Sequence, residues 1–197
     1  MNDETVQTPA EPGDLTSGAG EPRTPPPITA VDHHRGDLQA QLQLIQYGDY
    51  ECPFCGTAQP GVADLIRRHG AEMVFAFRHF PLVSQHPHAW HAAHAAEASA
   101  RQGRFWEMHE RLLAHQHHLT HDDLLAHAAA LGLDADTFER DLEDPQIAER
   151  VREDALGGVR SGVHGTPTFF VNGQMIEGGY REQEIEVALA DARQEHR

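Results

Sequence analysis

The sequence predicts an α/β domain that carries a helical insertion. Three observations support this fold class. Between residues 39 and 80, an apolar segment, a helical pattern and a second apolar segment follow one another, as in a strand–helix–strand unit. Helical spacing then dominates from about residue 85 to residue 161. The chain ends with a hairpin signal and an amphipathic helix, so the two outer parts form one α/β unit around the insertion.

The first 38 residues differ in composition from the rest of the chain. They are rich in Pro, Gly, Thr and Glu and poor in aliphatic side chains, so they bury too little surface to offset the entropy of ordering. We expect a disordered tail over residues 1–38, in which "TPPPI" favours an extended polyproline conformation. The folded domain is expected to span residues 39–197, with its helical insertion at about 85–161.

The first unit of the domain can be followed residue by residue. The apolar side chains from Leu42 to Tyr47 partly alternate, which predicts a strand. After the two cysteines, helical spacing relates Val62, Leu65 and Ile66. The segment Glu72–Phe80 is apolar enough for a second strand. The cysteines therefore lie at the entrance of the helix between two strands.

The insertion and the end of the chain contain several boundary signals. An alanine-rich stretch opens the insertion, and Thr120 followed by Asp123 resembles a capping box at the start of a later helix. Pro145 restarts a longer helix. Beyond the insertion, Asn172-Gly173 lies between two short apolar runs and predicts a β-hairpin. A last helix is expected from about Arg181 to Gln194.

The charge balance excludes several classes of partner. The chain has 31 acidic and 15 basic residues, a formal net charge of −16, and every basic residue is arginine. Clustered positive charge is needed for nucleic acids and for anionic lipids, so neither is an expected partner. No segment approaches the ~20 apolar residues of a membrane span, and no secretory signal pattern opens the sequence. We expect a cytoplasmic protein.

The only two cysteines, Cys52 and Cys55, surround Pro53 and Phe54 in the motif "CPFC". Proline suits the first position of a helix because it has no N–H to leave unpaired there. Cys52 would then meet the free N–H groups and the positive dipole of a helix N-terminus, which stabilise a thiolate. Cys55 lies one turn further in, within reach for a disulfide. This arrangement predicts that Cys52 attacks and Cys55 resolves the mixed disulfide.

A zinc site is the main alternative. A Cys-x2-Cys-Gly turn also binds zinc in ribbon proteins, but such sites need two more ligands. No other cysteine exists, and candidate histidines such as His117 and His121 lie some 60 residues away in the insertion. The strand before Cys52 and the helix after it favour the redox interpretation, and an incidental cysteine pair is the weakest of the three.

A second segment, "HGTPTFFVNG", has Thr166-Pro167 immediately before an apolar strand. Proline is excluded from strand interiors, so it belongs at the strand's first position. If this bond is cis, the residue before it can turn its backbone toward a neighbouring sulfur. The two segments together therefore predict one site.

The combined pattern resembles the DsbA-like family of thiol-disulfide oxidoreductases, which have a thioredoxin fold with a helical insertion. The resemblance covers about residues 40 to 193. It is carried by "YGDYECPFCG", "FRHFPL", "HPHA", "FWEMH" and "GTPTFFVNG". It implies exchange of disulfides with protein or small-molecule thiols. No cofactor is implied, because the electrons stay on sulfur, and neither a nucleic acid nor a membrane is an expected partner.

The family assigns roles to the matching positions of this chain. Cys52 would be the nucleophile and Cys55 the resolving thiol. The Thr166-Pro167 bond would be cis and pack beside the disulfide, while Pro53 and Phe54 would tune the reduction potential. Phe54 stands where strongly oxidising members carry a histidine, which removes a positive partner of the thiolate. We therefore expect a less oxidising pair than in those members.

Gln46 is a second departure from the family pattern. Thioredoxin-like proteins often bury a carboxylate six residues before the first cysteine, where it helps to move the proton of the second thiol. Glutamine can form hydrogen bonds there but cannot take the proton. Either Asp49 or Glu51 substitutes for the missing carboxylate, or Cys55 loses its proton slowly.

Sixteen histidines raise the question of metal binding, since eleven of them fall between His79 and His127. Helical spacing relates His88, His91 and His94, and also His117 and His121. We interpret most of them as family-typical or solvated positions and assign no metal site. His109 is expected to pack on an apolar helix face, and His164 lies two residues before Thr166.

Three classes of function remain open. The first is a cytoplasmic dithiol–disulfide oxidoreductase. The second is a redox or metal sensor, or a metal-binding protein, on the same fold. The third is a chaperone-like module whose insertion binds unfolded chains. Cysteine reactivity separates the first from the third, and metal stoichiometry separates the first from the second.

Overall fold

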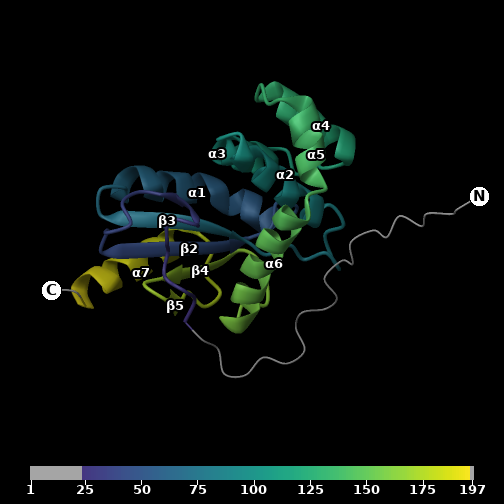
Figure 1. The fold of residues 1–197 in the computed structure, drawn as a ribbon. Coiled ribbons are helices and arrows are strands. Elements are labelled where there is room, and N and C mark those ends of the chain that lie inside the picture. Colours follow the sequence, from purple (N-terminus) through teal and green to yellow (C-terminus); the bar gives the residue numbers. More distant parts are fainter. Residues whose placement is uncertain (1–23, 196–197) are drawn as a thin grey trace, which may run out of the picture.

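The computed structural model describes residues 24–195, and its elements run in the expected order of an α/β unit around a helical insertion (Figure 1). The strands are β1 (His33–Arg35), β2 (Leu42–Gly48), β3 (Met73–His79), β4 (Thr168–Val171) and β5 (Gln174–Met175). The helices are α1 (Pro53–His69), α2 (Ala89–Arg101), α3 (Phe105–Ala114), α4 (His121–Ala130), α5 (Ala135–Leu142), α6 (Pro145–Arg160) and α7 (Glu182–Glu195).

The strands form one mixed sheet in the order β1-β3-β2-β4-β5. Strands β2 and β3 are parallel and joined by α1, which confirms the strand–helix–strand unit expected from the sequence. The other neighbouring pairs are antiparallel. The β4–β5 hairpin turns at Asn172 and Gly173, both with positive φ (47° and 82°), as a two-residue hairpin of this type requires. The Asn-Gly signal is therefore confirmed.

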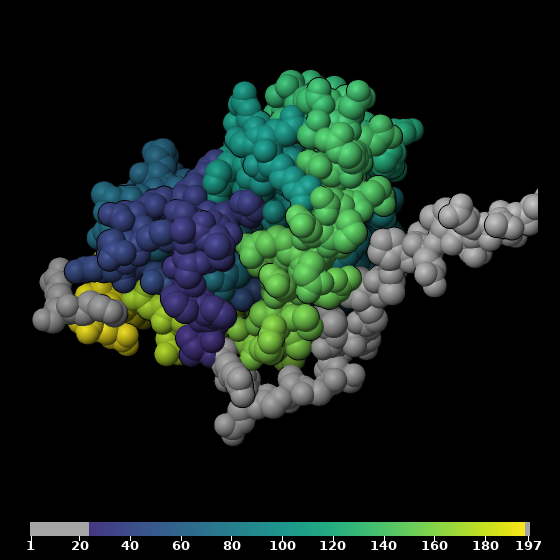
Figure 2. Space-filling view, in the orientation of Figure 1, coloured from purple at the N-terminus to yellow at the C-terminus, as the bar shows by residue number. Residues whose placement is uncertain are grey.

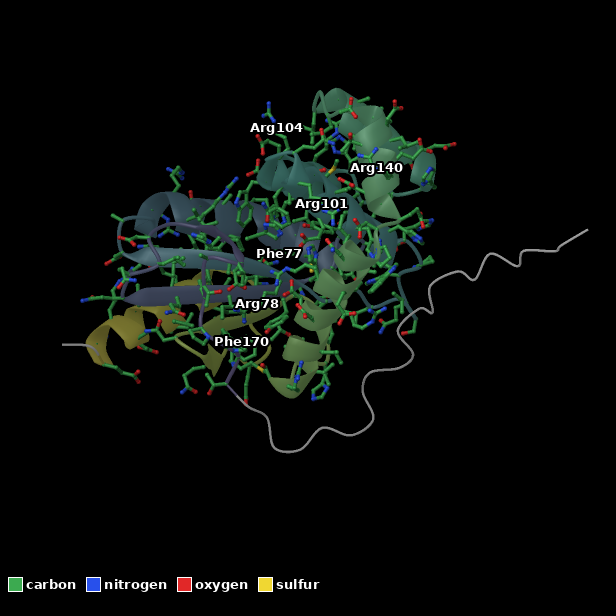
Figure 3. All side chains as sticks on the ribbon, viewed as in Figure 1. Phe77, Arg78, Arg101, Arg104, Arg140 and Phe170 are labelled. Atoms are coloured by element: carbon green, nitrogen blue, oxygen red, sulfur yellow. The ribbon has the colours of Figure 1, made fainter. Side chains whose placement is uncertain are left out.

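Alternation along β2 divides the core between the two faces of the sheet. Leu42 and Leu44 belong to the larger cluster, which includes residues of α1, α7 and the insertion. Ile45 and Tyr47 belong to the smaller cluster with residues of α6. We call these the first and second faces; Figure 3 labels one aromatic residue of each, Phe77 and Phe170.

Helices α2–α6 form the insertion between β3 and β4 (Figure 1). Ten residues of α2 are buried, because its alanines let neighbouring helices approach closely. The capping box of α4 is present: the Thr120 side chain accepts from the Asp123 backbone, and the Asp123 side chain accepts from the Thr120 backbone. Arg101 joins α2 to the start of α6 through Asp144, at 2.7 Å. The longer helix after Pro145 ends at Arg160.

The expected disordered tail over residues 1–38 is wrong for residues 24–38. These residues follow the second face of the sheet beside α6 and contribute the edge strand β1 (Figure 2). Residues 1–23 lie outside the described residues. The described structure begins at residue 24, which is 15 residues before the expected domain boundary at residue 39.

Two anchors explain why this segment is ordered despite its polar composition. Ile28 is buried in the second-face cluster, and its N–H donates to the Gln43 side chain. Arg78 of β3 donates to both carboxylate oxygens of Asp32, at 2.7 and 3.2 Å, and also to the carbonyl oxygen of Pro26. Both partners of the ion pair have side chains only 6% exposed. A buried charge in the sheet is therefore neutralised by the segment that covers it.

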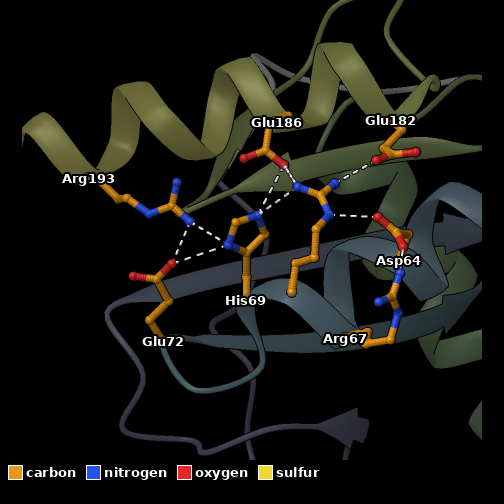
Figure 4. A network of polar contacts seen from close by, with 8 residues as sticks. Asp64, Arg67, His69, Glu72, Glu182, Glu186 and Arg193 are labelled. Carbon is orange, nitrogen blue, oxygen red and sulfur yellow. Dashed lines mark hydrogen bonds and ion pairs between the residues drawn. The ribbon is translucent and has the colours of Figure 1, made fainter.

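Helices α1 and α7 are joined by a network of charged side chains (Figure 4). Arg68 of α1 donates to Asp64 on its own helix and to Glu182 and Glu186 on α7, at 2.6, 2.5 and 2.9 Å. A second group with His69 at its centre extends the network; its other members are Glu72, Glu186 and Arg193. Together these contacts fix α7 against the helix that begins at the cysteines.

Candidate active site

The two cysteines occupy the start of α1, where β2 ends and the chain turns. Cys52 is the N-cap residue in an extended conformation, and Pro53 is the first residue of the helix. The backbone N–H groups of Cys55 and Gly56 donate to the Cys52 carbonyl at 3.0 and 3.3 Å, which closes the first turn. Both cysteines are free thiols. The sequence prediction of cysteines at the helix entrance is confirmed for their position.

The surroundings of the Cys52 sulfur stabilise negative charge. The Cys52 thiol donates to the carbonyl oxygen of Thr166 at 3.2 Å. Taken by itself, this acceptor favours the protonated thiol, but other groups outweigh it. A hydrogen bond from the Cys55 thiol lowers the pKa of Cys52 most strongly, burial raises it, and the N–H groups of Cys55 and Phe54 lower it further. The donors lower the pKa of Cys52 to about 5. The thiolate, which is the nucleophilic form, therefore dominates at neutral pH.

The pKa of Cys55 is shifted in the opposite direction, although both cysteine side chains are buried, at 3% exposed for Cys52 and 0% for Cys55. The Asp49 backbone N–H donates to the Cys55 sulfur at 3.4 Å. Burial raises the pKa of Cys55 well above its ordinary value, and the nearby Cys52 sulfur and the Asp49 charge raise it further. One thiol of the pair is thus ready to react and the other keeps its proton. That Cys52 attacks and Cys55 resolves the mixed disulfide stays a prediction.

The segment before β4 forms the opposite wall of the site. The peptide bond between Thr166 and Pro167 is cis, and the Thr166 carbonyl is the group that contacts Cys52. A shallow groove of about 310 Å³ runs beside this segment. Its apolar lining includes Phe54, which is 55% exposed and whose ring lies 5.5 Å from that of Tyr180. Neither cysteine lines the groove, but two neighbours of Cys52, Phe54 and Thr166, do.

Gln46 lies on β2 and is fully buried, and neither polar atom of its amide has a hydrogen-bond partner among the described residues. The two proposed substitutes for a carboxylate are already engaged. Asp49 accepts from His86 and from the Leu82 backbone at 2.7 and 2.8 Å. Glu51 accepts from His88, at 2.9 Å from its ring. That either one takes the Cys55 proton stays a prediction.

Gln116, in the turn after α3, is a site residue that the sequence analysis missed. Its side-chain N–H groups donate to the carbonyl oxygens of Tyr50 and Cys52, at 2.8 and 2.7 Å. A Cβ atom on Gly56 would lie 2.3 Å from the Gln116 oxygen, so this contact needs glycine at position 56. The helical insertion thereby holds the cysteine turn. No pattern in the sequence distinguishes Gln116 from the polar residues around it.

The histidines divide among separate surroundings. His88 pairs with Glu51, while His94 is buried and bonds through its ring to the Leu142 carbonyl, so they do not share one site. His109 is 1% exposed, contacts the Tyr50 hydroxyl, and has its pKa lowered to about 3 by burial. It is a neutral packing histidine, as expected. His164 is exposed.

Known proteins include relatives of this chain that share much of its sequence. The chain is 46% identical over 161 residues to Na(+)/H(+) antiporter NhaA 1 of Salinispora arenicola, a match that covers 82% of this chain and 24% of that protein. The chain thus spans about a quarter of that relative's length. No described helix is long and apolar enough to cross a membrane.

Two solved structures share the fold. A thioredoxin-like oxidoreductase from Silicibacter pomeroyi superposes with a TM-score of 0.76 at 23% identity, over 84% of this chain and 94% of that chain. Oxidised BdbD from Bacillus subtilis gives 0.76 at 21% identity, over 88% and 98%. The family of DSBA-like thioredoxin domains matches residues 43–190, which include the cysteine turn, the insertion and the Thr166-Pro167 segment. The chain belongs to this DSBA-like thioredoxin domain family.

Proposed function

We propose that this protein is a dithiol–disulfide oxidoreductase in which Cys52 is the nucleophile and Cys55 the resolving thiol. The observation that carries the proposal is the contrast between the two sulfurs: the pKa of Cys52 is lowered to about 5, whereas burial raises that of Cys55. A pair with equal thiols would have no preferred order of attack. Membership of the family supports thiol-disulfide exchange in general.

The reaction follows from this contrast. The Cys52 thiolate attacks one sulfur of a substrate disulfide, forms a mixed disulfide and releases the other substrate sulfur as a thiolate. Cys55 then loses its proton and attacks the Cys52 sulfur, which releases the second substrate thiolate. The substrate gains two electrons and becomes a dithiol, while Cys52 and Cys55 become a disulfide. The reverse sequence oxidises a substrate dithiol.

Four neighbours tune this exchange in the proposal. Pro53 is the first residue of α1, directly after Cys52, and as a proline it leaves no unpaired N–H at that position. Phe54 supplies an apolar surface beside the sulfur and no positive charge. The Thr166 carbonyl accepts from the reduced Cys52 thiol, and Pro167 lines the groove through which a substrate segment would approach. Protein disulfides in extended, apolar segments fit this groove best.

The pKa of Cys52 also bears on whether the pair reduces or oxidises its substrates. Reactive thiols of pKa about 7 and about 3.5 belong to couples near about −270 and −120 mV. A pKa of about 5 lies between these two values, which favours a potential between those of the two couples. Cytosolic glutathione, at about −220 to −260 mV, would keep such a pair mostly reduced. We propose a cytoplasmic location, where the pair would be reduced and would attack substrate disulfides. The transport activity named for the antiporter relative is not part of this proposal.

The first experiment is equilibration of the protein in glutathione buffers with a count of free thiols. The expected potential lies between about −270 and −120 mV, well away from both limits. A value near about −120 mV would contradict the proposed direction, because the reduced pair would then be too stable to pass its electrons to substrate disulfides. If no disulfide forms in any buffer, the oxidoreductase proposal fails, and zinc on the two cysteines becomes the better explanation.

A trapping experiment tests the two roles. With a peptide disulfide as substrate, Cys55→Ser is expected to accumulate a mixed disulfide at Cys52, because the resolving thiol is gone. Cys52→Ser is the matched control and is expected to form none, since the buried Cys55 keeps its proton. A mixed disulfide in Cys52→Ser but not in Cys55→Ser would reverse the assignment.

A further inference from the structure

Three side chains with metal-ligating atoms converge where β1, β3 and α2 meet, outside the cysteine site. His33 comes from β1, His79 from the end of β3, and Glu97 from α2. The Nε2 atoms of both histidines lie 2.9 Å from the same carboxylate oxygen of Glu97. The three ligand atoms lie within 4.8 Å of one another. Among residues 24–195, no other group of three potential ligands has this spacing.

The charges around this cluster are unequal. The Glu97 side chain is 9% exposed, and one of its carboxylate oxygens contacts both His33 and His79. Asp154 is a second buried carboxylate, and its Oδ2 accepts from the His79 backbone at 3.0 Å. Arg150 faces both, at 3.8 Å from Glu97 and 3.4 Å from Asp154. One guanidinium therefore serves two carboxylates, and an additional positive charge would be stabilised here.

Packing holds the two imidazoles in place. The His33 ring stacks on Phe105 with 3.5 Å between centroids and 9° between planes. The His79 ring meets Phe77 and Phe105 edge to face, at 5.5 and 6.1 Å. The His79 side chain is 1% exposed, whereas that of His33 is 19% exposed. The cluster is thus preorganised on its inner side and reachable from solvent on the His33 side.

We propose that His33, His79 and Glu97 bind a divalent transition-metal ion of the zinc type, with water from the His33 side as a fourth ligand. Two imidazole nitrogens and one carboxylate with an open fourth position form a recurring zinc ligand set. Ligands at about 2.1 Å from a tetrahedral ion lie about 3.4 Å apart, so each nitrogen–oxygen distance has to open by about 0.5 Å. Arg150 would then keep Asp154 as its partner.

Such an ion would have a structural effect separate from disulfide exchange. It would join the N-terminal strand β1 to the sheet and to the first helix of the insertion. Metal binding would therefore stabilise the docked segment that includes residues 24–38, without contacting either cysteine. The proposal goes beyond the proposed function and does not depend on it.

The test uses the full chain without an affinity tag and with Cys52→Ser and Cys55→Ser, so that neither cysteine binds metal. Titration with Co²⁺ is followed by its visible absorption, and Zn²⁺ is then added as a competitor. We expect one equivalent of Co²⁺ with a four- or five-coordinate spectrum, displaced by Zn²⁺. His33→Gln in this background is expected to weaken binding at least about 100-fold, because one of three ligands is lost. His117→Gln, an exposed histidine elsewhere in the chain, is the matched control and should change nothing.

Either of two titration results would overturn the proposal: no saturable binding in the parent protein, or equal affinity in His33→Gln and the parent. The second would assign the metal to exposed histidines. Glu97→Gln tests the carboxylate, and because its burial puts folding at risk, imidazole NMR of the parent protein gives an independent measurement. Zn²⁺ should shift the nitrogen signals of His33 and His79; shifts confined to other histidines would reject the site. Zn²⁺ should also raise the melting temperature of the parent and not that of His33→Gln.

Discussion

The two faces of the sheet have different physical roles. The first face is covered by α1, α7 and helices of the insertion, its core is mainly apolar, and Cys52, the proposed nucleophile, lies at the N-terminus of α1. The second face is covered by α6 and the segment from residue 24, and it buries Arg78, Asp32 and Asp154. The proposed active site thus lies at the edge of an apolar layer, whereas the packing of the opposite layer depends on paired charges. Substitutions on the two faces should therefore separate activity from stability.

The largest expected effect on stability is from Arg78→Met on the second face. This change leaves Asp32 buried without its partner, which typically costs about 3–5 kcal/mol of unfolding free energy. Urea unfolding measures the loss, and alkylation of Cys52 should keep the rate of the parent protein. Asp32→Asn is a milder second variant, and Arg160→Met on the exposed side of α6 is a control expected to change little. A large change in the Cys52 rate with unchanged stability would contradict the separation of the faces.

The pH dependence of the reduction potential tests the two pKa shifts in the cysteine pair on the first face. Because the pKa of Cys52 is lowered to about 5 and that of Cys55 is raised, reduction between pH 5 and 9 takes up one proton for two electrons. The potential should fall by about 30 mV per pH unit in this range and by about 59 mV per unit below pH 5. A slope of about 59 mV per unit up to pH 9 would contradict the lowered pKa.

The same shift makes a prediction for stability. A thiol whose pKa is lower in the folded than in the unfolded state stabilises the folded protein most above the unfolded value, near 9, and loses this contribution as the pH falls through about 5. As the pH rises from 5 to 9, the reduced protein should therefore become more stable relative to the oxidised protein. Thermal unfolding of both forms across this range is the measurement, and Cys52→Ser is the control that should lack the effect.

Gln116→Ala tests how the insertion supports the active site. The change removes two donors from the carbonyl oxygens of Tyr50 and Cys52, and we expect a loss of about 1–2 kcal/mol in unfolding free energy. It should also change the alkylation rate of Cys52, because the first turn of α1 is less fixed. Gln102→Ala is a matched control, since Gln102 also bonds to backbone but at an exposed position away from the cysteines. Equal alkylation rates in Gln116→Ala and the parent would remove Gln116 from the site.

The smallest expected effect belongs to the α1–α7 network of Figure 4. Arg68→Ala removes ion pairs with Asp64, Glu182 and Glu186, but these side chains are 30–37% exposed, and such pairs contribute about 0–1 kcal/mol each. We expect a total loss of about 1 kcal/mol that shrinks in high salt. Arg67→Ala, which affects only the Asp64 pair, should cost less. An effect as large as that of Arg78→Met would mean that exposed charges matter as much as buried ones.

The comparison of faces also explains what the sequence could predict. Strands β2 and β3 and helix α1 were found because apolar side chains repeat with the period of each element, and the cysteines mark the helix start. The N-terminal segment was missed because its order depends on Arg78, more than 40 residues away, and on a single buried Ile28. Gln116 was missed for a similar reason: its partners lie more than 60 residues earlier in the chain. Periodicity reports local burial, whereas polar contacts across the fold leave no periodic signal.

The lengths of the outer strands have a consequence for self-association. Strand β1 has three residues and β5 has two, so both borders of the sheet expose little backbone that another molecule could pair with. Short edge strands are one way in which proteins prevent sheets from joining into aggregates. A protein that handles partly unfolded chains by contact with their disulfides would benefit from such borders, because its own sheet offers those chains few sites for continued β-pairing.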